Sequence, residues 1–82
     1  MRSRFSYRTV ILSYHLHERA HGRHVSYAHI RATLNSPDFL RPHHTEAHKM
    51  IYGKYFDRHT TIIEIPVAFD GHLPVACTVW KL

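Results

Sequence analysis

A single cysteine, Cys77, limits more than any other feature how this chain of 82 residues can fold. Such a short chain lies near the lower end of the sizes that fold unaided, and one cysteine closes no intramolecular disulfide. It also excludes a cysteine-rich zinc site that would hold a small fold together. Because 44% of the residues are hydrophobic, one modest core can form without such support. Residues 1–82 are therefore expected to form a single domain in which helices cover a sheet.

The chain begins with the signals of a strand followed by a helix. The β-branched, apolar run at residues 8–13 predicts the strand. Ser13 is then suited to cap a short helix over residues 14–21, because its hydroxyl can accept a hydrogen bond from the first turn. Gly22 follows as the expected C′ residue, where the left-handed conformation favours glycine.

A second helix is expected directly afterwards. Ser26 resembles a second N-cap, and the helix that it begins runs over Tyr27–Asn35. Ile30 and Leu34 lie four residues apart and form its buried stripe. Pro37 ends this helix, because proline restricts the residue before it to extended conformations.

The second half changes to the two-residue period of β-strands, in three stretches at residues 48–56, 60–69 and 75–80. A turn at Asp70-Gly71, with Pro74 closing its loop, joins the last two stretches. Pro66 lies inside the middle stretch and indicates an edge position or a bulge, because proline donates no ladder hydrogen bond. Residues 37–47 are expected to be a loop. Three consecutive antiparallel strands against a helical hairpin make an α+β fold, with no repeat, linker or second domain.

The charge of the chain points to polyanionic or acidic partners. Eleven Lys and Arg residues stand against six Asp and Glu residues, a formal net charge of +5, and ten histidines add charge near neutral pH. A small domain with this balance attracts RNA, and it attracts acidic protein segments equally well. Residues 1–7 contain no apolar run, and the longest apolar runs are far shorter than the roughly 20 residues that cross a bilayer. A cytoplasmic protein with no membrane partner is expected.

The densest polar cluster lies on the first predicted helix. His15 and Arg19 lie four residues apart there, and Glu18 lies three residues after His15, so the three are neighbours on the helix surface. Cleavage of RNA by its own 2′-hydroxyl needs a base, cations beside the phosphorus and an acid for the leaving 5′-oxygen. Imidazole and guanidinium groups supply that chemistry. A solvated helix face with an ordinary Glu–Arg pair is the alternative, and these residues alone leave both open.

The histidines also raise the alternative of a metal site. His17 and His21 have the helical spacing of metal ligands, and His43-His44 or His48 could complete the set. The chain has no HExxH motif, no cysteine partner and no paired carboxylates at that spacing. No metal and no other cofactor is therefore expected.

A second basic and aromatic set follows on the predicted sheet, at Lys49, Tyr52, Lys54, Tyr55, Arg58 and His59. Aromatic rings that alternate with cations can stack bases and neutralise phosphates. In the alternative interpretation the tyrosines pack within the sheet and the cations keep an exposed edge soluble. Lys81, near the last residue, is in reach of a sheet face.

Three short motifs follow one another along the chain: Ser13-x-His15-x-x-Glu18-Arg19, Arg23-x-Val25-Ser26 and Ile30-x-x-x-Leu34-x-x-Pro37-Asp38. They resemble the opening of a family related to the RelE and BrnT toxins, in which an S-x-H-A-x-x-R helix precedes R-x-I-S and a second helix that ends near Asn-Pro. The last predicted strand, with Thr78 before Val79-Trp80, is similar to that family's closing V-V-T-x-Y/W strand. The resemblance extends from about Val10 to the end of the chain.

The resemblance implies a single RelE-like domain of order β-α-α-β-β-β, with two N-terminal helices packed on a twisted antiparallel sheet. It also implies an endoribonuclease toxin that a cognate antitoxin protein neutralises. His15, Arg19 and Arg23 match the basic positions of the family's motif, and Thr78 matches its terminal threonine. Leu16 stands where that family usually has alanine.

Residues and resemblance together predict a metal-independent endoribonuclease whose partners are RNA, including ribosome-bound mRNA, and an antitoxin. His15 would be the general base or acid, Arg19 and Arg23 would bind phosphate, and Glu18 would orient its neighbours. Further contributions are expected from three residues of the sheet region: Arg58, His59 and Lys81. The alternatives are a non-catalytic RNA- or protein-binding module of the same fold and a histidine-rich metal-binding protein.

Overall fold

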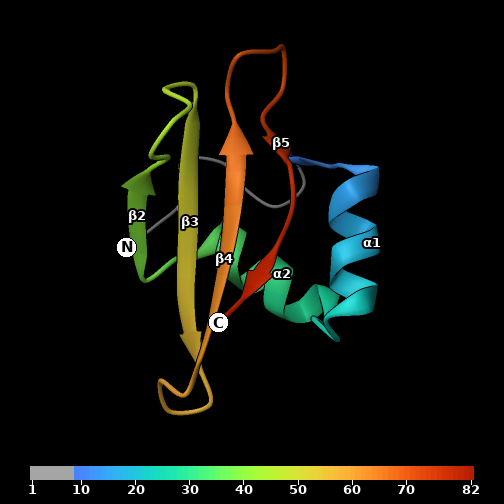
Figure 1. The fold of residues 1–82 in the computed structure, drawn as a ribbon, viewed down its shortest axis with the longest axis vertical. Coiled ribbons are helices and arrows are strands. Elements are labelled where there is room, and N and C mark those ends of the chain that lie inside the picture. The colour runs from blue at the N-terminus through green and yellow to red at the C-terminus, as the bar shows by residue number, and fades with distance from the viewer. Residues whose placement is uncertain (1–8) are drawn as a thin grey trace.

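The structure, a computed structural model, describes residues 9–82, and these form two helices and a mixed six-stranded sheet, an α+β fold. The elements in chain order are β1 (Ile11–Leu12), α1 (Tyr14–Gly22), α2 (Tyr27–Asn35), β2 (Phe39–Pro42), β3 (Lys49–Phe56), β4 (Thr61–Ala68), β5 (Val75–Ala76) and β6 (Trp80–Lys81). Figure 1 shows β2, β3 and β4 side by side, with α2 behind the sheet and α1 beside β5. Among residues 9–82, no helix has both the length and the apolar character that crossing a membrane requires.

The sheet is mixed rather than wholly antiparallel. Its strand order is β1-β5-β4-β3-β2, and β6 also pairs with β4. The β3–β4, β4–β5 and β4–β6 pairs are antiparallel, as the sequence predicts for its consecutive strands, and the unpredicted β2–β3 pair is antiparallel too. The prediction of a wholly antiparallel sheet is wrong, because β1 pairs with β5 in parallel. Short as it is, β1 places the start of α1 beside the last strands.

Strand β2 forms where a loop over residues 37–47 is predicted, so that prediction is wrong for Phe39–Pro42. Phe39 pairs with Gly53 of β3, and a Cβ atom built on Gly53 would run into the Phe39 ring. Leu40, on the other face, packs against the core. The sequence signal for β2 is therefore Gly53 in the next strand. The pattern of residues 37–47 taken alone does not contain that signal.

The last predicted strand is divided into β5 and β6, and Pro66 of β4 lies beside the break. β4 is a central strand, so the edge position predicted from Pro66 is wrong. The Pro66 carbonyl accepts a hydrogen bond from the Cys77 N–H, with 2.9 Å between nitrogen and oxygen. The N and C=O of one strand residue point the same way, so the side of Pro66 that lacks an N–H faces the irregular residues 77–79. The break in the neighbouring strand accommodates the proline.

Both helices begin at the predicted caps. The Ser13 hydroxyl accepts a hydrogen bond from the Leu16 N–H, and the Ser26 hydroxyl accepts one from the His29 N–H. α1 extends to Gly22, so the prediction of Gly22 as the left-handed C′ residue is wrong. His24, with a φ of 55°, has the left-handed conformation instead.

The core lies between the two helices and the sheet. Each large apolar side chain that becomes fully buried contributes about 1.5–3 kcal/mol, and the principal ones here are Leu16 of α1, Ile30 and Leu34 of α2, and Ile63, Ile65 and Val67 of β4. The predicted alternation of the middle strand is thus confirmed. Burial of Leu16 fixes which side of α1 faces the sheet, and therefore which polar side chains face away from it.

Candidate functional site

The position of α1 is fixed at both of its ends by the segment that contains β5 and β6. At the start, the Ser13 N–H donates to the Ala76 carbonyl, and the Ser13 hydroxyl donates to the Cys77 carbonyl over 2.7 Å. At the end, the Arg23 Nη1 donates to the Val79 carbonyl over 3.3 Å. These contacts set the rotation of α1, so its polar side chains have defined directions.

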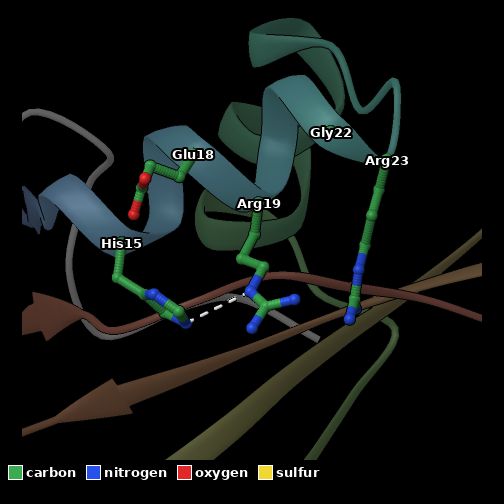
Figure 2. Close-up of a pocket in the computed structure, with 5 residues that line it drawn as sticks. All are labelled: His15, Glu18, Arg19, Gly22 and Arg23. Carbon is green, nitrogen blue, oxygen red and sulfur yellow. Dashed lines mark hydrogen bonds between the residues drawn. The ribbon is translucent and has the colours of Figure 1, made fainter.

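A groove of about 450 Å³ runs along one side of α1 and is lined by His15, Glu18, Arg19, Gly22 and Arg23. All five of these residues are exposed. Figure 2 shows the side chains of His15, Arg19 and Arg23 leaving α1 toward the same side. The groove thus combines one imidazole and two guanidinium groups, and it contains four of the seven site residues predicted from the sequence.

His15 and Arg19 are in direct contact within this groove. The Arg19 Nε donates a hydrogen bond to the His15 Nε2, with 3.3 Å between the nitrogens. An imidazole nitrogen accepts only when it carries no proton, so this contact fits the neutral tautomer that is protonated at Nδ1. The Nε2 lone pair is therefore occupied by the Arg19 N–H, and it can take a proton from an incoming hydroxyl only when Arg19 releases it.

Arg23 uses part of its guanidinium group for the fold and leaves the rest for a ligand. One of its five N–H groups bonds the Val79 carbonyl. The others are open to the groove, where an arginine can bind a phosphate through two parallel hydrogen bonds. Thr78, the threonine matched by the resemblance, precedes the carbonyl that holds Arg23, and it does not line the groove.

Glu18 lines the groove without contacting its basic residues. Within the described part of the chain, no hydrogen bond or ion pair joins the Glu18 carboxylate to another residue. Figure 2 shows its carboxylate along the helix and away from both guanidinium groups. The predicted role of Glu18 as an orienting partner therefore has no contact that supports it.

Three predicted residues lie outside the groove. Arg58 and His59 are in the turn between β3 and β4, with φ values of 56° and 71°. The His59 ring packs against Tyr55, with 4.9 Å between ring centroids, and Tyr55 alternates with the core-facing Phe56, so it lies on the face away from the helices. Lys81 pairs with the core residue Ile63, which places its side chain on the same sheet face as α1.

Gly22 is the lining residue that sequence analysis missed as part of a site. It has no polar side chain, so no motif of charged or hydrogen-bonding residues includes it. The one available signal was its place in the line of residues at every fourth position, directly after Glu18.

The second basic and aromatic set is largely committed to the fold. Tyr52 is 3% exposed and belongs to the core. Lys49 bonds Glu46 over 2.8 Å, and Lys54 lies 3.6 Å from Asp38. Packing within the sheet is therefore confirmed for Tyr52. The two lysines lie on β3, which is between β4 and β2, so they do not belong to an exposed edge.

These pairs also determine where negative charge is neutralised. The hydrogen bond from Lys49 lowers the pKa of the Glu46 carboxyl group below its ordinary value. The Tyr55 N–H bonds the Asp38 carboxylate over 2.9 Å and lowers the pKa of Asp38 in the same way. A third carboxylate, that of Glu64, pairs with Arg41 over 2.9 Å. Half of the six acidic residues in the chain thus neutralise lysines and arginines of the sheet region, and they leave Arg19 and Arg23 unmatched.

The histidines that could form a metal site do not assemble. Among residues 9–82, no group of three or more His, Cys, Asp or Glu residues could hold a metal ion. The His17 Nδ1 is hydrogen-bonded to the Tyr27 hydroxyl over 2.6 Å, and the His43 Nδ1 accepts from the Thr45 and Glu46 N–H groups. These ring nitrogens are already engaged within the protein.

Comparison of the chain with protein-family models, with curated proteins and with solved structures gave no match. The resemblance to the RelE and BrnT toxins therefore stays a prediction, and the residues of the groove are the evidence that bears on function.

Proposed function

We propose that the chain is a metal-independent endoribonuclease, the toxin of a toxin–antitoxin pair, and that RNA binds and is cleaved in the groove along α1. The observation that carries the proposal is the exposed convergence of His15, Arg19 and Arg23 on one side of a helix whose orientation is fixed at both ends. An RNA phosphate fits this set because it is an anion with several acceptor oxygens.

The two arginines bind the phosphodiester on which the reaction occurs. Arg23, held by the Val79 carbonyl, presents a guanidinium group with little freedom left to lose on binding. Arg19 lies between Arg23 and His15 and places a second positive charge beside the phosphorus. Both cations stabilise the negative charge that develops on the phosphate oxygens in the transition state.

His15 acts as the general base. When Arg19 turns from His15 to the bound phosphate, the freed Nε2 takes the proton of the 2′-hydroxyl. The 2′-oxygen then forms a bond to phosphorus, and the bond from phosphorus to the 5′-oxygen breaks. The products are a 2′,3′-cyclic phosphate and a 5′-hydroxyl, whose proton comes from water because the groove is open to solvent. A single imidazole supplies about 10²–10⁴-fold of rate, so the protein is expected to be a slow nuclease.

A second candidate function is a non-catalytic RNA-binding module of the same fold. The observations that favour it are that, among residues 9–82, one imidazole lines the groove and the Glu18 carboxylate does not contact that imidazole. Such a module keeps the phosphate-binding role of Arg19 and Arg23, and it lacks only the proton transfer at His15.

The cognate antitoxin is expected to be acidic. The formal net charge of +5 favours association with a negatively charged segment. A segment with carboxylates spaced to reach Arg19 and Arg23 would cover the groove and exclude RNA, which is the simplest way to neutralise the enzyme.

The experiment compares His15→Ala with His72→Ala, which alters an exposed histidine between β4 and β5. With EDTA present throughout, RNA cleavage should fall by about 10²–10⁴-fold in His15→Ala and stay unchanged in the control. RNA binding should persist in both variants, because the arginines remain. Equal cleavage by both variants would contradict the proposed chemistry, and binding without cleavage by the wild type would select the non-catalytic module.

A further inference from the structure

Gly22 is a glycine at a position where the fold does not require one. It is the last residue of α1, and its φ lies outside the left-handed region. A Cβ atom built there would meet nothing within 4 Å, whereas one built on Gly53 would run into the Phe39 ring. Gly22 therefore leaves a bare surface on α1 that neither packing nor backbone conformation requires.

His24 shows the opposite mismatch two residues later. Its φ of 55° is the left-handed conformation that favours glycine or asparagine after a helix. A side chain at such a position strains the backbone, and His24 is exposed, so its ring adds no core packing. The end of α1 therefore has no side chain at Gly22, where one would fit. It has an imidazole at His24, where glycine would relieve the backbone strain.

A second hollow lies beside this end of α1. It has a volume of about 310 Å³ and is lined by Ala20, His21, His24, Val25, Ser26 and Tyr27, none of them acidic. Tyr27 is 48% exposed, and its hydroxyl is held by the His17 Nδ1 over 2.6 Å. The hollow thus presents a fixed aromatic ring together with two imidazoles.

Gly22 joins this hollow to the groove. It lines the groove, while the residue before it, His21, lines the second hollow. One turn earlier on the same line of α1, Glu18 presents a carboxylate that repels phosphate. A nucleic acid strand that leaves the groove over α1 therefore meets the least obstruction at Gly22.

We propose that single-stranded RNA bound in the groove crosses α1 at Gly22 and continues into the second hollow, where a base stacks on Tyr27. The inference rests on the proposed function of the groove. His21 and His24 line this hollow and would contact the flanking backbone. The RNA must be single-stranded, because only an unstacked base offers its face to an aromatic ring.

The test measures the affinity of the protein, at fixed salt, for a dinucleotide and for a single-stranded RNA of about ten nucleotides, both with methylated 2′-oxygens so that the proposed reaction cannot cleave them. Wild-type protein should bind the longer RNA more tightly. Tyr27→Ala should weaken binding of the longer RNA by about fivefold or more, the effect of losing one stacked base. Tyr14→Ala is the matched control, because Tyr14 is an exposed tyrosine of α1 that lines neither the groove nor the second hollow.

Two further variants separate binding from folding. Gly22→Leu places a side chain on the crossing, and His24→Gly removes an imidazole while relaxing the backbone. Both should leave Tm unchanged or raise it by a few degrees, about 4 °C for His24→Gly. Both variants should nevertheless bind the longer RNA more weakly. Because their Tm does not fall, damage to the fold cannot explain that loss of affinity.

The outcomes distinguish the two claims. If Arg23→Ala weakens binding of both RNAs while Tyr27→Ala, Gly22→Leu and His24→Gly bind the longer RNA like the wild type, the second surface is overturned and the groove stands. Tighter binding of a duplex than of the single strand also overturns the second surface. If the wild type binds neither RNA at low salt, both claims fall together.

Discussion

At the scale of single residues, Arg23 takes part both in the fold and in the proposed site. Its backbone N–H donates to the Arg19 carbonyl at the end of α1, and its side chain donates to the Val79 carbonyl. Because the guanidinium group is planar and carries five N–H groups, it can hold that carbonyl and a phosphate at the same time. A lysine at this position would keep the charge and lose the second contact.

Arg23→Lys is therefore expected to weaken RNA binding about tenfold, which corresponds to losing one charge-assisted hydrogen bond of roughly 1.5 kcal/mol. The control is Arg31→Lys, on an exposed arginine of α2 that lines neither the groove nor the second hollow. Filter binding or fluorescence anisotropy measures both. An Arg23→Lys variant that binds RNA as tightly as the control would show that charge alone acts at this position.

How well single residues were predicted depends on what places them. His15 and Arg19 were predicted to be neighbours because helical spacing alone determines that they meet. Arg58 and His59 were predicted to join them, but a turn with left-handed residues places these two elsewhere, and no periodic pattern encodes that turn.

At the scale of elements, Ser13 connects α1 to the last strands. Its hydroxyl accepts from the Leu16 N–H and donates to the Cys77 carbonyl, so one group caps the helix and fixes it to the sheet. Ser26 performs only the first task for α2, since its hydroxyl accepts from the His29 N–H at an exposed position. The two serines therefore form a natural pair for comparison.

Ser13→Ala should lower the free energy of unfolding by about 2 kcal/mol, and Ser26→Ala by about 1 kcal/mol, because only the first also removes a hydrogen bond to the strands. Chemical denaturation of both variants measures the difference. Equal losses would mean that the Cys77 contact does not contribute to the position of α1.

The helices were predictable as elements because caps and the apolar period are local signals, while two features of the sheet depend on neighbouring strands. β2 is recognisable only when Phe39 is seen to pack over Gly53. The division between β5 and β6 follows from the missing N–H of Pro66 in the strand beside them. A pattern read along one segment contains neither piece of information.

At the scale of the whole molecule, the cations of β2 and β3 are neutralised by carboxylates, whereas those lining the groove along α1 are not. Arg41, Lys49 and Lys54 are paired with carboxylates, whereas Arg19 and Arg23 meet no carboxylate within the described residues. Net charge alone predicted a polyanionic partner without a location. Arg31, Arg58 and Lys81 also have no carboxylate partner among the described residues. The convergence of Arg19 and Arg23 in one groove therefore favours α1 as the surface that such a partner meets.

The chemistry at the 2′-hydroxyl tests the central claim most directly. Wild-type protein is incubated in EDTA with an RNA and with the same strand carrying 2′-deoxyribose throughout, and the new ends are analysed. The proposed reaction predicts 2′,3′-cyclic phosphate and 5′-hydroxyl ends from the RNA and no cleavage of the deoxyribose strand, because that strand lacks the attacking oxygen. Cleavage of the deoxyribose strand, or 5′-phosphate ends on the RNA product, would contradict the account.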